Sequence, residues 1–534
     1  MLVNEMNDNK LVFDRAIFVN ELDKTENWDI IIIGGGATGL GTAVDAASRG
    51  YKTLLLEQAD FAKGTSSRST KLVHGGVRYL AQGNIGLVYE ALHERGLLLQ
   101  NTPHLVKKQS FIIPCYSWFD KLQYFIGLKL YDLLAGKFSF GRSKLLSRDE
   151  VIGAIPEIEI KGLRGGIEYW DGQFDDARLA INLAQTAAEQ GATLLNYFKV
   201  TGLIKANDGK IGGVITKDIE TGKIYQLKAK AVINATGVFV DDILRMDKPS
   251  SKPLVRSSQG VHVVLDRSFL AGNKALMIPK TTDGRVLFAV PWHDHVLVGT
   301  TDTPLDNHSL EPIALEKEIT FILETAGQYL TKAPTSNDVL SVFAGLRPLA
   351  APDKDTGATK EISRSHKLIV NPSGLITITG GKWTTYRKMA EDVVNKVIEA
   401  AGFTKQPCAT RNLKIHGYAQ PGADHLAIYG SDAILINELI KHHPELREKL
   451  DETLPYLRAE VIWAVKKEMA RTVEDVLARR SRLLFLDAKA AIKLAPIVAE
   501  LMAVELGYDI KWREDQLDSF IALASQYLTG NKSE

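Results

Sequence analysis

Three glycines near the start of the chain have a spacing that suits phosphate binding. Gly34, Gly36 and Gly39 follow the apolar run Ile30–Ile33 in the pattern GxGxxG. The first glycine permits a tight turn, the second lets the backbone approach a pyrophosphate, and the third lets a helix pack closely on a strand. The helix N-terminus offers unpaired N–H groups to the phosphates. Glu57 ends the next apolar run, where a carboxylate can accept hydrogen bonds from ribose hydroxyls, so the pattern predicts a dinucleotide site.

A second stretch, Gly64–Leu80 (GTSSRSTKLVHGGVRYL), is dense in hydrogen-bonding groups and glycines. Hydroxyl and backbone donors that suit pyrophosphate or ribityl oxygens come from Thr65, Ser66 and Ser67. Gly75 and Gly76 have no side chain where a flat ring system must lie, and Arg78 and Tyr79 can then reach its open face. We therefore expect this stretch to hold the reactive ring of the cofactor.

The glycine fingerprint alone does not separate NAD from FAD, and three further features favour FAD. The fingerprint lies near the N-terminus of a chain of 534 residues, far longer than one nucleotide-binding domain. The late strand in AVINATG ends at Gly237 and can close on the nucleotide half of the site. TGGKWTTYR offers a second helix N-terminus at the flavin end, with Gly381, Lys382 and Thr384. Several segments must converge on a ligand as large as FAD.

Charge and cysteine content exclude several other classes of protein. The chain has 65 Lys and Arg against 64 Asp and Glu, so it has no overall attraction for nucleic acid. Its two cysteines, Cys115 and Cys408, are far apart and lack metal-ligand spacing, which predicts no disulfide framework and no metal site in a reducing cytoplasm. The charged N-terminal stretch has no apolar core of a secretory signal, and no apolar run is long enough to span a membrane.

The elements that must position these groups follow from the apolar pattern. Ile30–Ile33, the alanine-rich helix after it and the strand in KTLLLE form a βαβ unit, which predicts a parallel sheet. Residues 176–237 predict a helix, a strand, a hairpin and another buried strand. Residues 375–402 predict a strand, a Gly-Gly turn and a helix, the same order as at the glycine fingerprint. Short strands from about 253 to 347 predict an antiparallel sheet in a second lobe. A helical, charge-rich tail begins near 420.

With these segments assembled, the chain resembles the FAD-dependent glycerol-3-phosphate dehydrogenases from about residue 28 to about 525. The resemblance rests on IIIGGGATGLGTAVDAASRG, GTSSRSTKLVHGGVRYL, VINATG, VLVGTTDTP, AGLRPL and TGGKWTTYRKMAE, and on EVIWAVKKEMARTVEDVLARRSRLLFLDAKAA in the tail. It implies an α/β fold, with a glutathione-reductase-like FAD-binding Rossmann domain, an antiparallel-sheet substrate-capping domain and a C-terminal all-α domain.

The resemblance also implies domain boundaries. The oxidoreductase domain is expected at 28–415 and the helical domain at 420–534. The FAD-binding parts are expected at about 28–110, 165–250 and 340–400, and the substrate-capping parts at about 111–164 and 251–339.

In activity, the resemblance implies oxidation of sn-glycerol 3-phosphate to dihydroxyacetone phosphate by hydride transfer to FAD, with electrons passed to a membrane quinone. The sister group of oxidases uses oxygen and carries an insertion in the capping region, for which GTTDTP and GLRPL leave no evident room. An oxidase is the nearest alternative, and another amine- or hydroxy-acid-oxidising flavoenzyme is a further one. A flavin redox sensor without turnover is also open, although a sensor needs no arginines for a phosphate.

Residue roles follow from matching the family's motifs. Arginine suits a phosphate because its fork donates paired hydrogen bonds to two oxygens. Arg347 in GLRPL and Arg364 in ISRSH match substrate-binding arginines, and Arg78 is expected at the same pocket. Tyr79 is expected to orient the substrate hydroxyl, and Lys382 to place positive charge near the reduced flavin or the substrate oxygen.

His262 in QGVHVVLD is the favoured base, because a neutral imidazole accepts a proton near pH 7. The alternative for His262 is a structural histidine of the sheet. His74, in the HGG motif, is the competing base, and we expect it to position the flavin instead.

The segment WFDKLQYFIGLKLYDLLAGKF has aromatic and aliphatic residues at helical spacing, with Lys121, Lys129 and Lys137 nearby. Such a helix either lies in a membrane interface, with its lysines near anionic headgroups, or packs inside the capping lobe. The first alternative predicts a cytoplasmic protein bound peripherally to the inner face of the cell membrane. The helical tail is open to three roles: a homodimer contact, a membrane contact or a packed lid.

Overall fold

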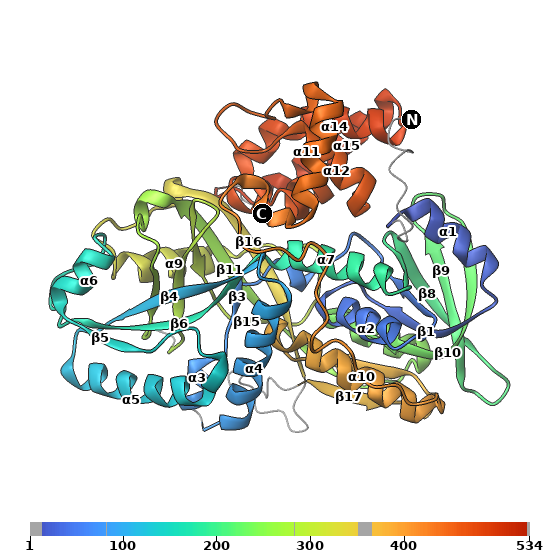
Figure 1. Ribbon diagram of the computed structural model, residues 1–534, viewed down its shortest axis with the longest axis horizontal. Helices are drawn as coiled ribbons and strands as arrows, with labels where there is room; N and C mark the ends of the chain where they lie inside the picture. The colour runs from blue at the N-terminus through green and yellow to red at the C-terminus, as the bar shows by residue number, and fades with distance from the viewer. Residues whose placement is uncertain (1–12, 82, 282–283, 351–365, 531–534) are drawn as a thin grey trace.

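Two large β-sheets lie side by side, and the C-terminal helices lie above both in the view of Figure 1. This arrangement is seen in a computed structural model of the chain, which describes residues 13–81, 83–281, 284–350 and 366–530. The first sheet builds the nucleotide end of the site and the second builds the opposite wall.

Among the described residues, the first sheet has eight strands, with a parallel centre in the order β18-β10-β1-β2-β7. These strands are β1 (Asn27–Ile33), β2 (Thr53–Leu56), β7 (Thr193–Leu195), β10 (Ile224–Asn234) and β18 (Ile376–Thr379). Antiparallel partners are added by β8 (Phe198–Lys205), β9 (Ile211–Asp218) and β17 (Lys367–Val370). The predicted βαβ unit and the predicted hairpin, here β9 and β10, are confirmed.

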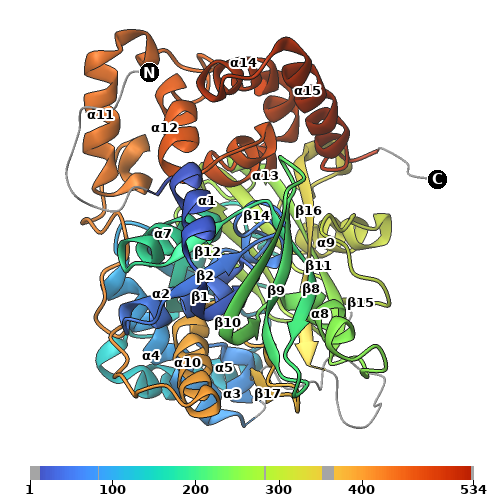
Figure 2. The same cartoon turned by 90° about the vertical axis from the view of Figure 1, so that its right-hand side faces the viewer.

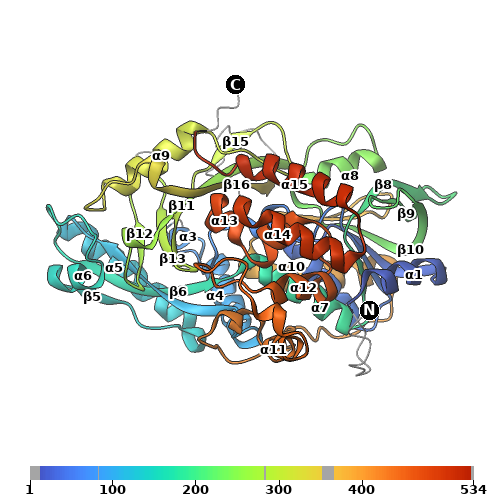
Figure 3. The same ribbon diagram turned by 90° about the horizontal axis from the view of Figure 1, so that it is seen from above.

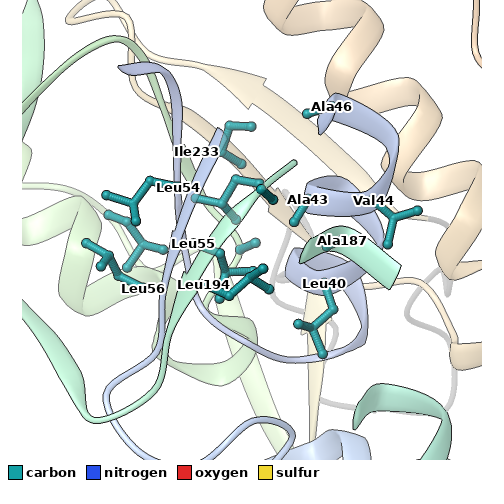
Figure 4. Packing of buried hydrophobic residues seen from close by; sticks show 14 of the residues in the cluster. Leu40, Ala43, Val44, Ala46, Leu54, Leu55, Leu56, Ala187, Leu194 and Ile233 are labelled. Atoms are coloured by element: carbon teal, nitrogen blue, oxygen red, sulfur yellow. The ribbon is translucent and has the colours of Figure 1, made fainter. Parts of the chain in front are cut away.

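The centre of the first sheet is covered by α2 (Ala37–Ser48), α7 (Asp176–Glu189) and α10 (Tyr386–Ala401). Every residue of Ile30–Ile33 is buried, because both faces of β1 are covered. Small residues on α2 let it pack against both α7 and α10. Figure 4 shows Leu40 and Ala43 of α2 with Leu55 and Leu194 in this core. The core holds the glycine turn rigidly at the edge of the sheet.

In the part of the chain that the structure describes, the second sheet has ten strands, mostly antiparallel, in the order β15-β11-β14-β13-β12-β4-β6-β3, with β16 added to β11 and β5 to β6. They are β3 (Leu72–Val73), β4 (Val106–Pro114), β5 (Lys144–Leu146), β6 (Gly166–Phe174), β11 (Val255–Asp266), β12 (Ala275–Ile278), β13 (Leu287–Trp292), β14 (His295–Gly299), β15 (Thr303–Leu305) and β16 (Val339–Ala350). The antiparallel prediction is confirmed except at β12 and β4, which pair in parallel.

The second sheet extends beyond the segments expected for it. β6 and most of β16 fall in the ranges 165–250 and 340–400, which we expected in the FAD-binding part. Yet β6 pairs with β4 over its whole length, and β16 pairs with β11 from Val255↔Ala350 to Leu265↔Val339. Long antiparallel strands bury their backbone groups only when a partner runs beside them, so these strands join the second sheet. Arg347, on β16, therefore belongs to the wall opposite the nucleotide turn.

The remaining helices surround the sheets. They are α1 (Arg15–Lys24), α3 (Val77–Ala81), α4 (Ile85–Asn101), α5 (Trp118–Ala135), α6 (Arg148–Ala154), α8 (Val240–Asp247) and α9 (Glu316–Gly327). The predicted helical tail is confirmed as α11 (Asp432–His442), α12 (Arg458–Glu468), α13 (Leu483–Leu486), α14 (Ala488–Leu506) and α15 (Ile510–Ser525). Figures 2 and 3 show α14 and α15 lying across the end where the two sheets meet. Within the described ranges, no helix combines the length and apolar character needed to cross a membrane.

Candidate active site

A cavity of about 520 Å³ lies at the carboxyl ends of β1, β2 and β10. In open α/β sheets this edge is where ligands bind. Eight residues that we expected to hold the cofactor line it: Gly34, Gly36, Glu57, Thr65, Ser66, Gly237, Gly381 and Lys382.

The glycine turn has the shape that a pyrophosphate requires. Gly34 has a φ of +109°, and a Cβ built there would lie 2.7 Å from the carbonyl oxygen of Ala235. A Cβ at Gly39 would lie 1.9 Å from the carbonyl oxygen of Gly34, so helix and turn can pack only around glycine. At Gly36 the nearest atom is the hydroxyl oxygen of Ser66, at 3.1 Å, so a side chain there would enter the space that the backbone leaves for a ligand.

Glu57 lines the same cavity and is oriented by two backbone donors. Its carboxylate accepts hydrogen bonds from the N–H groups of Gly35, at 2.6 Å, and Ala59, at 3.0 Å. Burial raises the pKa of Glu57 above its ordinary value, and the two donors oppose that rise. The contacts hold the carboxyl group at the mouth of β2, where a ribose hydroxyl can reach it.

A second cavity of about 320 Å³ adjoins the first. The wall common to both consists of Thr65, Pro348, Gly380, Gly381, Lys382 and Trp383. Expected site residues in the second cavity are His74, Tyr79, His262, Arg347 and Thr384. One elongated ligand can therefore extend from the glycine turn into the space in front of the second sheet.

Two expectations for the Gly64–Leu80 stretch need correction. The Ser67 side chain is buried and donates a hydrogen bond to the carbonyl of Ala62, at 2.6 Å, and Ser67 lines neither cavity. Its hydroxyl thus closes the loop itself and does not face a cofactor. A Cβ at Gly75 would lie 2.6 Å from Leu92 Cδ2 and from the Tyr131 hydroxyl, so this glycine makes room for α4 and α5 and not for a flavin ring.

Arg347 is anchored by backbone carbonyls of the second sheet. Its guanidinium donates hydrogen bonds to the carbonyls of Thr301, at 3.0 Å, and Gln259, at 3.3 Å. Thr300 Oγ1 accepts a third bond at 3.2 Å, and Asp302 lies 3.5 Å away. Five donors in a rigid fork allow an arginine to be held in this way and still present N–H groups to an anion in the cavity.

His262 lies on β11 at the back of the second cavity and is 2% exposed. Its Nε2 lies 2.9 Å from the Thr70 hydroxyl, and its ring stacks on Phe343 with centroids 5.0 Å apart. Burial, together with the positive charges of Lys71 and Arg347, lowers the pKa of His262 well below its ordinary value. The imidazole is therefore neutral at pH 7 and able to accept a proton.

Lys382, Tyr79, His74 and Thr384 meet at the junction of the two cavities. Lys382 Nζ lies 3.8 Å from the centroid of the Tyr79 ring, a cation–π contact. The His74 N–H donates a hydrogen bond to Thr384 Oγ1 at 3.1 Å, which joins the HGG segment to the turn after Gly381. The positive charge of Lys382, on the common wall, thus lies beside the phenol of Tyr79, which lines the second cavity.

Two predicted substrate residues cannot be placed. Arg364 lies outside the residues that the structure describes, and for Arg78 only the backbone, in α3, is described.

The sequence did not predict several residues that line the second cavity, although they lie within the quoted motifs: Thr70 in GTSSRSTKLVHGG, Thr300 in GTTDTP and Trp383 in GGKWTTY. Thr and Trp carry no charge, so their type alone gave no signal. It also missed the apolar end of the second cavity, which includes Phe111, Met277 and Phe288.

A mononucleotide would fill only one of two cavities that share a wall, whereas a flavin dinucleotide spans both. The fold and this site define a flavin-dependent oxidoreductase. The family model described as FAD dependent oxidoreductase matches residues 29–387, and the model described as the C-terminal domain of alpha-glycerophosphate oxidase matches residues 375–513. The cofactor is FAD, as predicted.

Known proteins similar to this chain identify its family within the flavin-dependent oxidoreductases. The mitochondrial glycerol-3-phosphate dehydrogenase of Bos taurus is 40% identical, over 93% of this chain and 73% of its own. That of Schizosaccharomyces pombe is 38% identical, over 97% of this chain and 89% of its own. The crystal structure of the Bacillus halodurans glycerol-3-phosphate dehydrogenase with FAD superimposes with a TM-score of 0.78 at 29% identity, covering 97% of this chain and 99% of that one. The chain belongs to the family of FAD-dependent glycerol-3-phosphate dehydrogenases.

Proposed function

We propose that this protein oxidises sn-glycerol 3-phosphate to dihydroxyacetone phosphate. The observation that carries the proposal is the pairing of an anchored arginine and a buried neutral histidine, Arg347 and His262, in the cavity that adjoins the nucleotide cavity. The names of the relatives support the substrate. A phosphate-bearing alcohol needs both an anion clamp and a proton acceptor, and the names of the relatives favour it over other anionic alcohols.

Each residue of the site has a separate role in the proposed reaction. When bound, FAD supplies the acceptor for the hydride. Arg347, with Arg78 and Arg364, holds the substrate phosphate, and His262 accepts the proton of the hydroxyl. Tyr79 orients that hydroxyl, and Lys382 places positive charge where negative charge develops. His74 and Thr384 fix the wall against which the cofactor ring rests.

We propose that the cofactor residues are Gly34, Gly36, Gly39, Glu57, Thr65, Ser66, Gly237, Gly381, Lys382 and Thr384. Residues 28–415 are assigned to the reaction and residues 420–534 to the support of its site.

Anaerobic mixing with glycerol 3-phosphate tests the activity. The yellow absorbance of the purified protein should bleach with sn-glycerol 3-phosphate, whereas the mirror-image sn-glycerol 1-phosphate and glycerol should leave it unchanged. Bleaching by neither phosphate would contradict the proposal and leave a flavin-binding protein without this turnover.

The electron acceptor is proposed to be a membrane quinone, reached from the cytoplasmic face of the membrane. Support comes from α5, whose outer face exposes large apolar side chains: Trp118, Phe119, Leu122, Ile126, Leu130 and Leu133. On α4, Ile85 and Tyr89 are also exposed, and Figure 1 shows α3, α4 and α5 along the same lower edge. Apolar area of this extent marks a surface that contacts a partner or a membrane.

The lysines of α5 do not act as we expected from their positions. Lys121 is buried and its Nζ donates to the carbonyl of Leu146 at 2.7 Å. Lys129 Nζ donates to the carbonyl of Ser143 at 2.5 Å. These contacts fix α5 to the second sheet, so the proposed membrane attachment relies on its apolar face.

An oxygen-using oxidase is the alternative to the quinone enzyme. Hydrogen peroxide released stoichiometrically with product in air would establish the oxidase. Rapid reduction of a soluble ubiquinone analogue, with little peroxide, is the outcome expected here.

A further inference from the structure

Among the described residues, the imidazole of His262 has one hydrogen-bond partner, the hydroxyl of Thr70. The distance from Nε2 to Thr70 Oγ1 is 2.9 Å. The other ring nitrogen, Nδ1, is buried and has no hydrogen-bond partner in the described part of the chain. His262 is 2% exposed, whereas Thr70 is half-buried and lines the second cavity in front of it. The Thr70 hydroxyl therefore joins the cavity to a nitrogen of the His262 ring.

The backbone around Thr70 is held by one buried carboxylate. Asp176 Oδ2 accepts hydrogen bonds from the Ser69 hydroxyl and from Lys71 Nζ, each at 2.7 Å. Lys71 Nζ also donates to the carbonyl of Ser67 at 2.7 Å. Residues on both sides of Thr70 are thus tied to the same group, which fixes the direction of its side chain.

Further contacts hold the backbone around Thr70 in a conformation that is uncommon. Lys71 has a φ of +60°, a left-handed conformation that is uncommon for a residue with a side chain. Arg482, from the C-terminal helices, donates to Asp176 Oδ1 at 3.0 Å and to the carbonyl of Ser67 at 3.1 Å. Lys71, Asp176 and Arg482 are all buried. Strained backbone that is held this firmly is a recurring feature of functional sites.

We propose that Thr70 relays the substrate's proton to His262. The inference rests on the proposed function, in which His262 is the base. The substrate O–H bond breaks as its proton passes to Thr70 Oγ1, while the hydroxyl proton of Thr70 passes to Nε2 of His262. The C–H bond at the same carbon breaks, FAD, when bound, would accept its electron pair and hydrogen as hydride, and the C–O bond becomes a carbonyl. Thr70 is unchanged at the end, and His262 holds the proton.

Threonine is suited to this role because a hydroxyl accepts and donates at the same time and rotates to meet both partners. A serine would keep that ability, whereas a valine has nearly the same shape and no hydroxyl. Thr70→Ser and Thr70→Val are therefore a matched pair.

The experiment measures flavin reduction anaerobically by rapid mixing at saturating glycerol 3-phosphate, in wild type, Thr70→Val, Thr70→Ser, His262→Ala and Thr70→Val/His262→Ala. General base catalysis contributes about 10²–10⁴-fold, so Thr70→Val and His262→Ala should each slow reduction on that order. Thr70→Ser should stay close to wild type. The double variant should be no slower than either single variant, because the two residues act as a unit. Flavin content, and the affinity for dihydroxyacetone phosphate read from the flavin spectrum, should be unchanged in Thr70→Val.

Mixtures of H₂O and D₂O separate a relay from mere positioning of His262. Two protons in motion give a curved dependence of the rate on the D₂O fraction in wild type and Thr70→Ser, and one proton gives a straight line in Thr70→Val. A straight line in wild type overturns the relay.

The other outcomes separate the relay from the proposed function. Wild-type reduction in Thr70→Val with slow reduction in His262→Ala overturns the relay and leaves His262 as base. A wild-type rate of flavin reduction in both Thr70→Val and His262→Ala overturns the assignment of His262 as base, and the relay with it. Independent, multiplying losses in the double variant, or weaker product binding in Thr70→Val, also overturn the relay.

Discussion

At the scale of residues, burial decides what each polar group does in this site. His262 is neutral because the sheet and the cations Lys71 and Arg347 disfavour its charged form. Arg347 keeps its direction because the backbone carbonyls of Gln259 and Thr301 hold its guanidinium, with Asp302 beside it at 3.5 Å. The chemistry therefore depends on the environment of these side chains as much as on their type.

The lowered pKa of His262 predicts the acid limb of the pH profile. The base must be neutral, so activity falls as the pH drops through its pKa in the free enzyme. Because that pKa lies well below the ordinary value of 6.5, kcat/KM should lose nothing to His262 between pH 8 and pH 6.5. Steady-state rates from pH 5 to 9, corrected for the ionisation of the substrate phosphate, check this. An acid limb centred at 6.5 or above would contradict the assignment.

Arg347 supports a prediction about binding. Charge-assisted hydrogen bonds contribute about 1.5–3 kcal/mol, so Arg347→Ala should weaken substrate binding roughly 10–100-fold. Arg347→Lys should recover little of this, because a lysine lacks the fork that reaches both the carbonyls and the phosphate. Substrate titration of flavin reduction gives the affinities. Arg148→Ala, at an exposed arginine on α6, is the control, and equal binding by Arg347→Ala would remove Arg347 from the clamp.

At the scale of elements, two features bear on ligand binding: the packing of the turn before α2 and the exposed outer face of α5. The turn is close-packed on one side and open to the cavity on the other. The face of α5 is apolar with no covering element in the described chain.

The glycine turn predicts different results for neighbouring glycines. Gly36→Leu should fold but lose FAD, because its side chain would enter the cavity. Gly39→Ala should lower the thermal stability of the whole protein, because its Cβ would collide with the carbonyl of Gly34. Gly153→Ala in α6, where a Cβ meets no atom within 4 Å, is the control. Flavin content and thermal unfolding distinguish the three, and a yellow Gly36→Leu protein would refute the assignment of the turn.

The apolar face of α5 predicts flotation with anionic vesicles. Leu122→Glu should abolish flotation while flavin content stays normal, because Leu122 is 60% exposed and contributes to no core. Val504→Glu, at an 80% exposed residue of α14 on the far side of the molecule, should float like wild type. If Leu122→Glu still floats, α5 is not the site of attachment.

At the scale of the whole molecule, buried ion pairs join the C-terminal helices to the loop that follows β2. Arg479 Nε donates to Asp60 Oδ2 at 2.5 Å, and Arg480 donates to both oxygens of Asp60. These cations hold the pKa of Asp60 below its ordinary value. The loop continues to Thr65, Ser66 and Thr70, so these ion pairs attach the helical tail to the segment that lines the two cavities.

Breaking this junction should destabilise the holoprotein. Removing one partner of a buried pair costs about 3–5 kcal/mol, because the remaining charges stay buried. Asp60→Asn should therefore unfold at a clearly lower temperature and release its flavin there, as read by flavin fluorescence. Asp515→Asn breaks the exposed pair with Lys511 and should change the stability by about 0–1 kcal/mol. Equal unfolding temperatures for both variants would show that the junction adds no stability.

Local pattern alone determined the βαβ unit, the glycine turn, the succession of short strands and the helical tail. Each of these depends on residues a few positions apart, where the spacing of apolar side chains and glycines acts directly on the backbone. The position of Arg347 and His262 in one cavity was likewise predicted, through the motifs that carry them.

Only the tertiary structure decided which neighbours these groups meet. Thr70 and His262 are 192 positions apart, and no local pattern places a hydroxyl against that ring. The inward turn of Lys121, the burial of Ser67 and the packing of Tyr131 over Gly75 were decided in the same way. Such contacts arise when two sheets and a helical domain pack together. Packing depends on the summed shape of many distant side chains, which the spacing of a single segment does not contain.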